Sequence, residues 1–136
     1  KVFITPHHMG YQGGYRGYNW KCFTEGDITP FVEMYSRHGL AESDQGDYPY
    51  LHDMGPRQWE GTIQYGLELG NKFGIMASTD QHSGYPGSYG DGRIGVMAPS
   101  LTRDAIWEAL RTRHVCAATG DKLLSTSAST TLSWVT

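Results

Sequence analysis

The sequence predicts an α/β protein whose sheet is mainly parallel. Short apolar segments that resemble strands alternate along the chain with helical segments or with long loops rich in glycine and tyrosine, and this alternation is typical of parallel sheets. Histidine and aspartate residues directly follow two of the strand-like segments, namely His7 with His8 and Asp80 with His82. Sites in α/β sheets and barrels form at the carboxyl ends of strands, so the same pattern predicts where a site would lie.

Length and composition limit the classes of protein that fit. The chain has 136 residues, which suits one domain because domains usually have about 100–200 residues. No apolar run reaches the roughly 18 residues of a membrane-spanning helix, so we expect no membrane partner. The net charge of −3 provides no basic surface for nucleic acid. A small phosphorylated ligand is still compatible with this charge.

The first half of the chain is predicted to alternate strands with long loops. Residues 1–6 are β-branched and aromatic and end at a proline, which predicts a strand. Residues 9–30 predict a loop longer than the usual connection, which is typical of a functional loop or a lid. A second strand is predicted over 31–35, and a second long loop over 36–56.

The second half is predicted to hold two helices and three strands. Apolar residues at spacings of three to four predict a helix over 57–73. Short apolar segments predict strands over 74–78, 93–98 and 115–118. Thr102 lies between the last two strands and is the expected N-cap of a second helix.

The strongest chemical signal is the sequence Asp80-Gln81-His82. Residues at i and i+2 of an extended segment point to the same side, and a carboxylate beside an imidazole suits zinc, manganese or iron. The alternative is that Asp80 caps a turn and His82 lies on the surface. At His7 and His8, adjacent residues face opposite ways, so one is expected to face the site and the other to pack behind it. Because both signals follow strands, the joint pattern favours a metal site.

Four further residues are candidates for contact with a substrate. Arg16 and Arg37 each offer a bidentate fork for an anion such as phosphate, although a solvated surface position is equally compatible. His38 could reach the site from the second loop. Glu33 lies within a predicted strand and could be a ligand, a base or the partner of a buried arginine, with a structural role favoured.

Four segments appear in an order that resembles a known family. Residues 6–11 read Pro-His-His-Met-Gly-Tyr, and residues 32–39 read Val-Glu-Met-Tyr-Ser-Arg-His-Gly. Residues 77–87 read Ala-Ser-Thr-Asp-Gln-His-Ser-Gly-Tyr-Pro-Gly, and residues 113–120 read Arg-His-Val-Cys-Ala-Ala-Thr-Gly. Together they resemble the C-terminal half of PHP-type metallohydrolases, the polymerase and histidinol phosphatase superfamily. More narrowly, they resemble an uncharacterised branch described as a domain of unknown function.

The resemblance implies a fold and a chemistry. Residues 1–124 would form part of a distorted (β/α)7 PHP-type barrel that is incomplete at its N-terminal side, and residues 125–136 would form a Ser/Thr-rich tail without an assigned role. Two or three divalent ions, zinc, manganese or iron, would lie at the strand ends. The implied activity is the hydrolysis of phosphate esters by a metal-activated water.

The resemblance also implies which residues act. Asp80 and His82 match the family's late Asp-x-His ligand pair, and we assign them as the catalytic residues. His7 matches a ligand histidine at a strand end, and His8 is the alternative. His38, like Glu33, is characteristic of the narrower branch and carries no firm role there.

The chain departs from the family at its other ligands. The family's early His-x-His pair, a further early histidine and a bridging glutamate are not found in this sequence. We therefore expect a homo-oligomer or a missing N-terminal half to complete the barrel. Two functions stay open, a metal-dependent hydrolase of a small phosphorylated substrate and a non-catalytic binding or assembly module. Such a module would keep a partial metal site and hold a sugar or a protein with its Tyr/Gly-rich loops.

Overall fold

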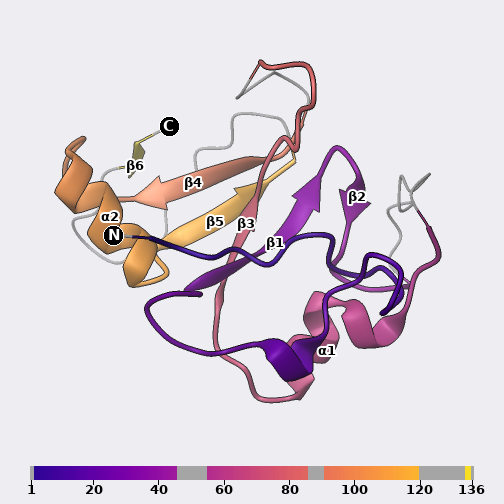
Figure 1. Ribbon diagram of the computed structural model, residues 1–136. Helices are drawn as coiled ribbons and strands as arrows, with labels where there is room; N and C mark the ends of the chain where they lie inside the picture. The colour runs from indigo at the N-terminus through magenta and orange to yellow at the C-terminus, as the bar shows by residue number, and fades with distance from the viewer. Residues whose placement is uncertain (1, 46–54, 86–90, 120–133, 136) are drawn as a thin grey trace.

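A computed structural model describes residues 2–45, 55–85, 91–119 and 134–135 (Figure 1). Within these ranges the chain forms two small three-stranded sheets. The strand order is β2-β1-β3 in the first sheet and β5-β4-β6 in the second. None of the helices in the described ranges is long and apolar enough to cross a membrane.

The first sheet is built around β1 (Phe31–Ser36). A tight turn leads from β1 into the antiparallel β2 (Gly39–Leu40). The chain then passes through α1 (Ile63–Glu68) and returns as β3 (Gly74–Ala77), which pairs with β1 in parallel. Because β1 and β3 run in the same direction, their carboxyl ends reach one edge of the sheet (Figure 1).

The second sheet is antiparallel throughout its described part. Its central strand is β4 (Arg93–Met97), which pairs with β5 (Val115–Ala118) and with β6 (Trp134–Val135). The helix α2 (Arg103–Arg111) connects β4 to β5. β5 lies alongside β3, so the two sheets are neighbours. Gly74 permits this approach, because a Cβ there would lie 2.9 Å from a methyl carbon of the first residue of β5.

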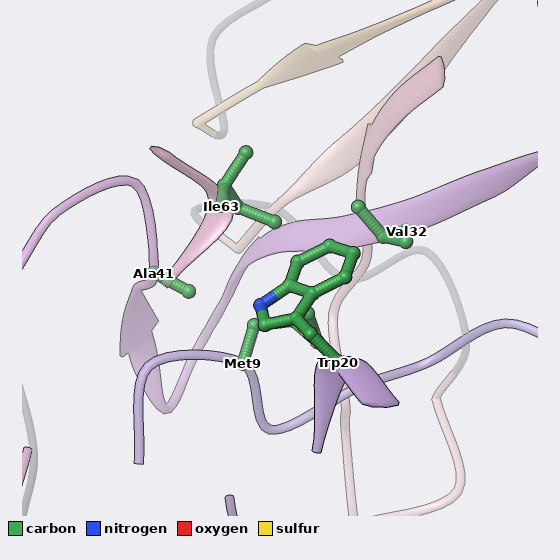
Figure 2. Packing of buried hydrophobic residues seen from close by; sticks show 5 residues of the cluster. All are labelled: Met9, Trp20, Val32, Ala41 and Ile63. Atoms are coloured by element: carbon green, nitrogen blue, oxygen red, sulfur yellow. The ribbon is translucent and has the colours of Figure 1, made fainter. Parts of the chain in front are cut away.

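A hydrophobic core lies where the long N-terminal loop meets β1 and α1. Its buried members, drawn in Figure 2, are Met9, Trp20, Val32, Ala41 and Ile63. Trp20 begins the short 3-10 helix η1 (Trp20–Cys22), and its Nε1 donates a hydrogen bond to the carbonyl of Thr62 at 2.9 Å. The loop predicted over 9–30 therefore contributes Met9 and Trp20 to the core.

The helix predicted over 57–73 is much shorter in the structure. A 3-10 turn, η2 (Trp59–Gly61), occupies the start of the predicted range, and α1 begins only after Thr62. The side chain of Thr62 accepts a backbone hydrogen bond from the first turn of α1 and so fixes the start of the helix. Gly70, with φ 82°, follows the end of α1, as is usual for a glycine after a helix.

The strand predicted over 1–6 is not part of either sheet. Residues 2–7 run extended beside β1 without joining a ladder. Two backbone hydrogen bonds hold this segment, from Ile4 N to the carbonyl of Ile28 at 2.8 Å and from Glu33 N to the carbonyl of Pro6 at 3.1 Å. The segment therefore still reaches the edge of the sheet where β1 and β3 end.

The predicted barrel and the mainly parallel sheet are both wrong. No closed barrel exists within the described residues, so the expected distorted (β/α)7 PHP-type barrel is not formed there. Three of the four described strand pairings are antiparallel, and only β1 with β3 is parallel. An antiparallel partner needs only a short reversal, as between β1 and β2, whereas a parallel partner needs a crossover of a dozen or more residues. The alternation of elements cannot by itself tell these two connections apart.

The predicted Ser/Thr-rich tail over 125–136 falls mostly outside the described residues. Its described part is β6, which pairs with β4 through Val96 opposite Val135 and Met97 opposite Trp134. The second predicted loop, over 36–56, contains β2 and leaves the described range at residue 46.

Candidate metal centre

Histidine and aspartate side chains meet at the carboxyl ends of β1 and β3. His38 follows β1, while Asp80 and His82 follow β3. His38 Nε2 lies 3.5 Å from Asp80 Oδ2, and His82 Nε2 lies 3.2 Å from Asp80 Oδ1. Each oxygen of one carboxylate is therefore close to a different imidazole.

The extended N-terminal segment brings two more histidines to the same carboxylate. One ligand atom from each of His7, His8 and Asp80 lies within 4.8 Å of the other two, and the same holds for His38, Asp80 and His82. The His7 and His8 rings are 4.1 Å apart, and the His8 and His38 rings are 6.1 Å apart. We call these five residues the His–Asp cluster. Asp80 belongs to both groups of three.

The centre of the cluster is buried and its rim is open. The side chains of His38 and Asp80 are 14% and 18% exposed, whereas that of His82 is 70% exposed. Within the described part of the chain, neither His38 Nε2 nor Asp80 Oδ2 makes a hydrogen bond. A buried polar atom without a partner costs about 1–3 kcal/mol, so this pair of facing atoms suits a bound cation.

The backbone at the cluster is strained. His8 has φ 56° and Asp80 has φ 46°, which makes them two of the three described non-glycine residues with positive φ. Such conformations cost of order 1–3 kcal/mol and gather at functional sites. The pairing of β1 with β3 also shifts register between Glu33 and Tyr35, close to the same edge. Bulges of this kind often re-aim side chains beside sites.

Burial lowers the pKa of His8. The neighbouring His7 lowers it further, as do His38 and Arg16, while the Asp80 carboxylate acts in the opposite direction. A low pKa keeps the imidazole neutral, and the neutral imidazole is the form that binds metal ions.

Glu33 lies behind the cluster and joins three segments. Its side chain is buried, and its carboxylate accepts a hydrogen bond from Ser78 Oγ on the residue after β3. The backbone N–H of His8 also donates to it. Burial raises the pKa of Glu33, and the negative charge of Asp80 adds to this rise. The described partners of Glu33 are thus a serine and a backbone amide, not the arginine considered from the sequence.

Two arginines lie at the edge of the cluster. Arg37 is exposed, and its Nη1 donates a hydrogen bond to Gln81 Oε1 at 3.0 Å. Gln81 is the residue between Asp80 and His82 in the sequence. Arg16 is also exposed and lies near enough to His8 to lower its pKa. The structure therefore places both predicted anion contacts beside the cluster but outside its two groups of ligand atoms.

No protein-family model, curated protein or solved structure matches this chain. The resemblance to PHP-type metallohydrolases therefore stays a prediction.

The structure brings together more ligand-type residues than the sequence assigned. His7, His8, Asp80 and His82 were the predicted ligands, and His38, a predicted substrate contact, lies among them. Sequence reasoning also missed the buried Tyr11, whose hydroxyl donates to the carbonyl of His38 at 3.4 Å. The signal for Tyr11 was its place in the first motif, three residues after His8. The signal for His38 was its position shortly after a strand, two residues beyond β1, just as Asp80 lies three residues beyond β3.

Proposed function

We propose that this chain carries a divalent-metal site that serves the hydrolysis of phosphate esters. The observation that carries the proposal is the shared carboxylate of Asp80, which joins two groups of three ligand-type residues. The cluster offers several imidazole nitrogens and one carboxylate. This donor set suits zinc, manganese or iron, whereas calcium and magnesium prefer sites built from oxygen atoms.

The residues present fit such an ion. His38 and Asp80 face each other with buried atoms that lack hydrogen bonds in the described chain, and His82 completes their group from the solvent side. The second group consists of His7, His8 and the same Asp80. Each group could hold one divalent ion, and Asp80 would contribute to both groups. A divalent ion supplies charge that polarises a phosphoryl oxygen and lowers the pKa of water.

The chain's own residues would bind and orient the substrate. Arg37 and Arg16 border the cluster with forked donors that match the oxygens of a phosphate. Gln81 holds the guanidinium of Arg37 beside Asp80. Behind the cluster, Glu33 links the backbone of His8 to Ser78 and so holds the two ligand-bearing segments together.

The decisive experiment removes the shared carboxylate. In the Asp80→Ala variant both groups lose a ligand, so we expect bound zinc or manganese, measured by elemental analysis after dialysis, to fall to the level of a metal-free control. Hydrolysis of p-nitrophenyl phosphate with added zinc or manganese should disappear in the same variant. Asp27→Ala is the matched control, because Asp27 is an exposed carboxylate that pairs with Arg111.

Two results would contradict the proposal. Unchanged metal content in Asp80→Ala would show that Asp80 is not a metal ligand and would contradict the assignment of the site. Wild-type protein that binds metal at Asp80 but turns over no phosphate ester at any metal concentration would support the binding module and overturn the hydrolase.

A further inference from the structure

A second pocket lies apart from the His–Asp cluster, between the glycine-rich loop 13–19 and the segment 58–61. Its volume is about 260 Å³. Small-molecule sites usually measure about 300–1,000 Å³, so a ligand the size of one small ring would suit it. We call it the loop pocket. It shares no lining residue with the cluster.

Backbone contacts fix the walls of the loop pocket. Gln58 Oε1 accepts a hydrogen bond from Gly13 N at 2.9 Å, which ties one wall to the other. A Cβ on Gly17 would lie 1.9 Å from the carbonyl oxygen of Tyr11, and a Cβ on Gly61 would lie 2.6 Å from the same atom. Only glycine allows these close approaches. The pocket is therefore shaped by the fold itself.

The side chains that line the pocket can bind hydroxyl groups. Asn19 Oδ1 already accepts from Lys21 N at 3.0 Å, so its amide nitrogen is the donor it can offer a ligand. Tyr18 adds a phenol that can donate or accept, and Glu60 adds a carboxylate that only accepts. Among the described residues that line the pocket there is no lysine or arginine. One negative charge without a balancing cation disfavours an anionic ligand.

Tyr18 also contributes an aromatic side chain to the lining of the pocket. Its ring packs edge-on against Trp20 of the core, with ring centroids 5.5 Å apart and an interplanar angle of 89°. This contact packs the Tyr18 ring against the core. An aromatic ring with a polar tip can cover the C–H face of a ligand and hydrogen-bond to its rim.

We propose that the loop pocket binds a neutral sugar ring, either a free monosaccharide or the end of a glycan. The aromatic side chain of Tyr18, the amide, phenol and carboxylate groups and the lack of a lysine or arginine among the described lining residues all match a ring rich in hydroxyl groups. The proposal does not depend on the metal site, because it uses none of the residues of the His–Asp cluster.

The test is a titration of the full chain followed by NMR of its backbone amides. Glucose, galactose and methyl β-glucoside are the probes, and the last stands for the end of a glycan. We expect saturable shifts confined to the amides of 13–19 and 58–61, with dissociation constants in the millimolar range. The same shifts should persist in Asp80→Ala, which separates this test from that of the metal site.

Three substitutions probe the pocket without disturbing its shape. Glu60→Gln removes the charge, Tyr18→Phe removes the hydroxyl, and Gly13→Ala adds a methyl group that would lie 3.7 Å from Gln58 Oε1, an ordinary contact. The exchange of a charged hydrogen-bond acceptor for a neutral one should weaken binding up to about tenfold in Glu60→Gln. Lys21→Ala is the matched control, because Lys21 is exposed on the same loop and does not line the pocket.

The two ligand sources give different positive results. Binding of methyl β-glucoside at least as tight as that of glucose indicates a glycan end, and a preference for the free sugar indicates a monosaccharide. Three results would overturn the proposal: no shift with any of the sugars at tens of millimolar, unchanged affinity in all three pocket variants, or tighter binding of glucose 6-phosphate than of glucose at these amides.

Discussion

Asp80 and His82 approach each other through a turn, not through an extended strand. The sequence argument placed both side chains on one side of an extended segment, but Asp80 adopts the left-handed conformation with φ 46°. Gln81 Oε1 accepts a hydrogen bond from Ser83 N and from Arg37, which holds the turn that follows. The sequence predicted that the side chains of Asp80 and His82 lie on the same side. It did not predict the left-handed backbone conformation of Asp80.

The protonation of the buried Glu33 should affect stability. Burial raises its pKa above the ordinary value of 4.5, so the folded state holds a proton that the unfolded chain would release. Stability is therefore full below the unfolded pKa and decreases as the pH rises from about 4.5 through the folded pKa of Glu33.

Replacing Glu33 by glutamine tests this pH dependence. Glu33→Gln keeps the shape of the protonated acid, so we expect a flatter dependence of the free energy of unfolding on pH and a stability at pH 8 that equals or exceeds that of the wild type. Chemical denaturation across this pH range, with a chelator present, gives the measurement. Glu25→Gln, at an exposed glutamate, is the control. An unchanged slope in Glu33→Gln would contradict the assignment.

At the scale of elements, the ends of α2 show which contacts the sequence alone could predict. Thr102 was the predicted N-cap, and its side chain accepts from Ala105 N at 3.3 Å. Asp104 lies in the first turn, and Arg111 in the last turn pairs with Glu108. Each of these contacts spans only a few residues, so the sequence alone could predict them.

The cap of α2 gives a prediction about stability. Thr102→Ala should lower the free energy of unfolding by about 0.5–2 kcal/mol, because the first turn loses the hydrogen bond to its Ala105 amide. Thr102→Ser keeps the capping hydroxyl and should restore most of this loss. Urea denaturation measures both variants. Equal stability of Thr102→Ala and the wild type would show that the cap does not contribute to the free energy of unfolding.

At the scale of the whole molecule, a glycine in α1 lets the helix pack on the core tryptophan. A Cβ added at Gly66 would lie 2.3–2.5 Å from carbon atoms of the Trp20 ring. The same ring stacks on Phe73 and donates from its Nε1 to the Thr62 carbonyl. Close contact between α1 and the N-terminal loop therefore depends on the absence of a side chain at this position.

The Gly66→Ala variant measures this packing. Alanine favours the helix by about 1 kcal/mol in isolation, but overpacking a core typically costs about 1–3 kcal/mol. We expect a net loss of stability, measured by urea denaturation. Gln64→Ala, at an exposed site in the same helix, should stay within about 0.5 kcal/mol of the wild type. A stabilised Gly66→Ala would contradict the packing argument.

Most strand positions followed from the sequence, but their pairing did not. The segments predicted over 31–35, 74–78, 93–98 and 115–118 correspond to β1, β3, β4 and β5. Their apolar runs are local properties. The predicted strand over 1–6 and the expected part of a (β/α)7 barrel were wrong, because strand partners are chosen by contacts between residues far apart in the chain.

The sequence by itself determined which residue types follow the strands, and so it predicted the ligand-type residues His7, His8, Asp80 and His82. Only the tertiary structure decided that His38 joins them and that Glu33 lies behind them. The physical reason is the parallel pairing of β1 with β3, which places two strand ends at one edge although their residues are about forty positions apart. Local propensity carries no information about that pairing.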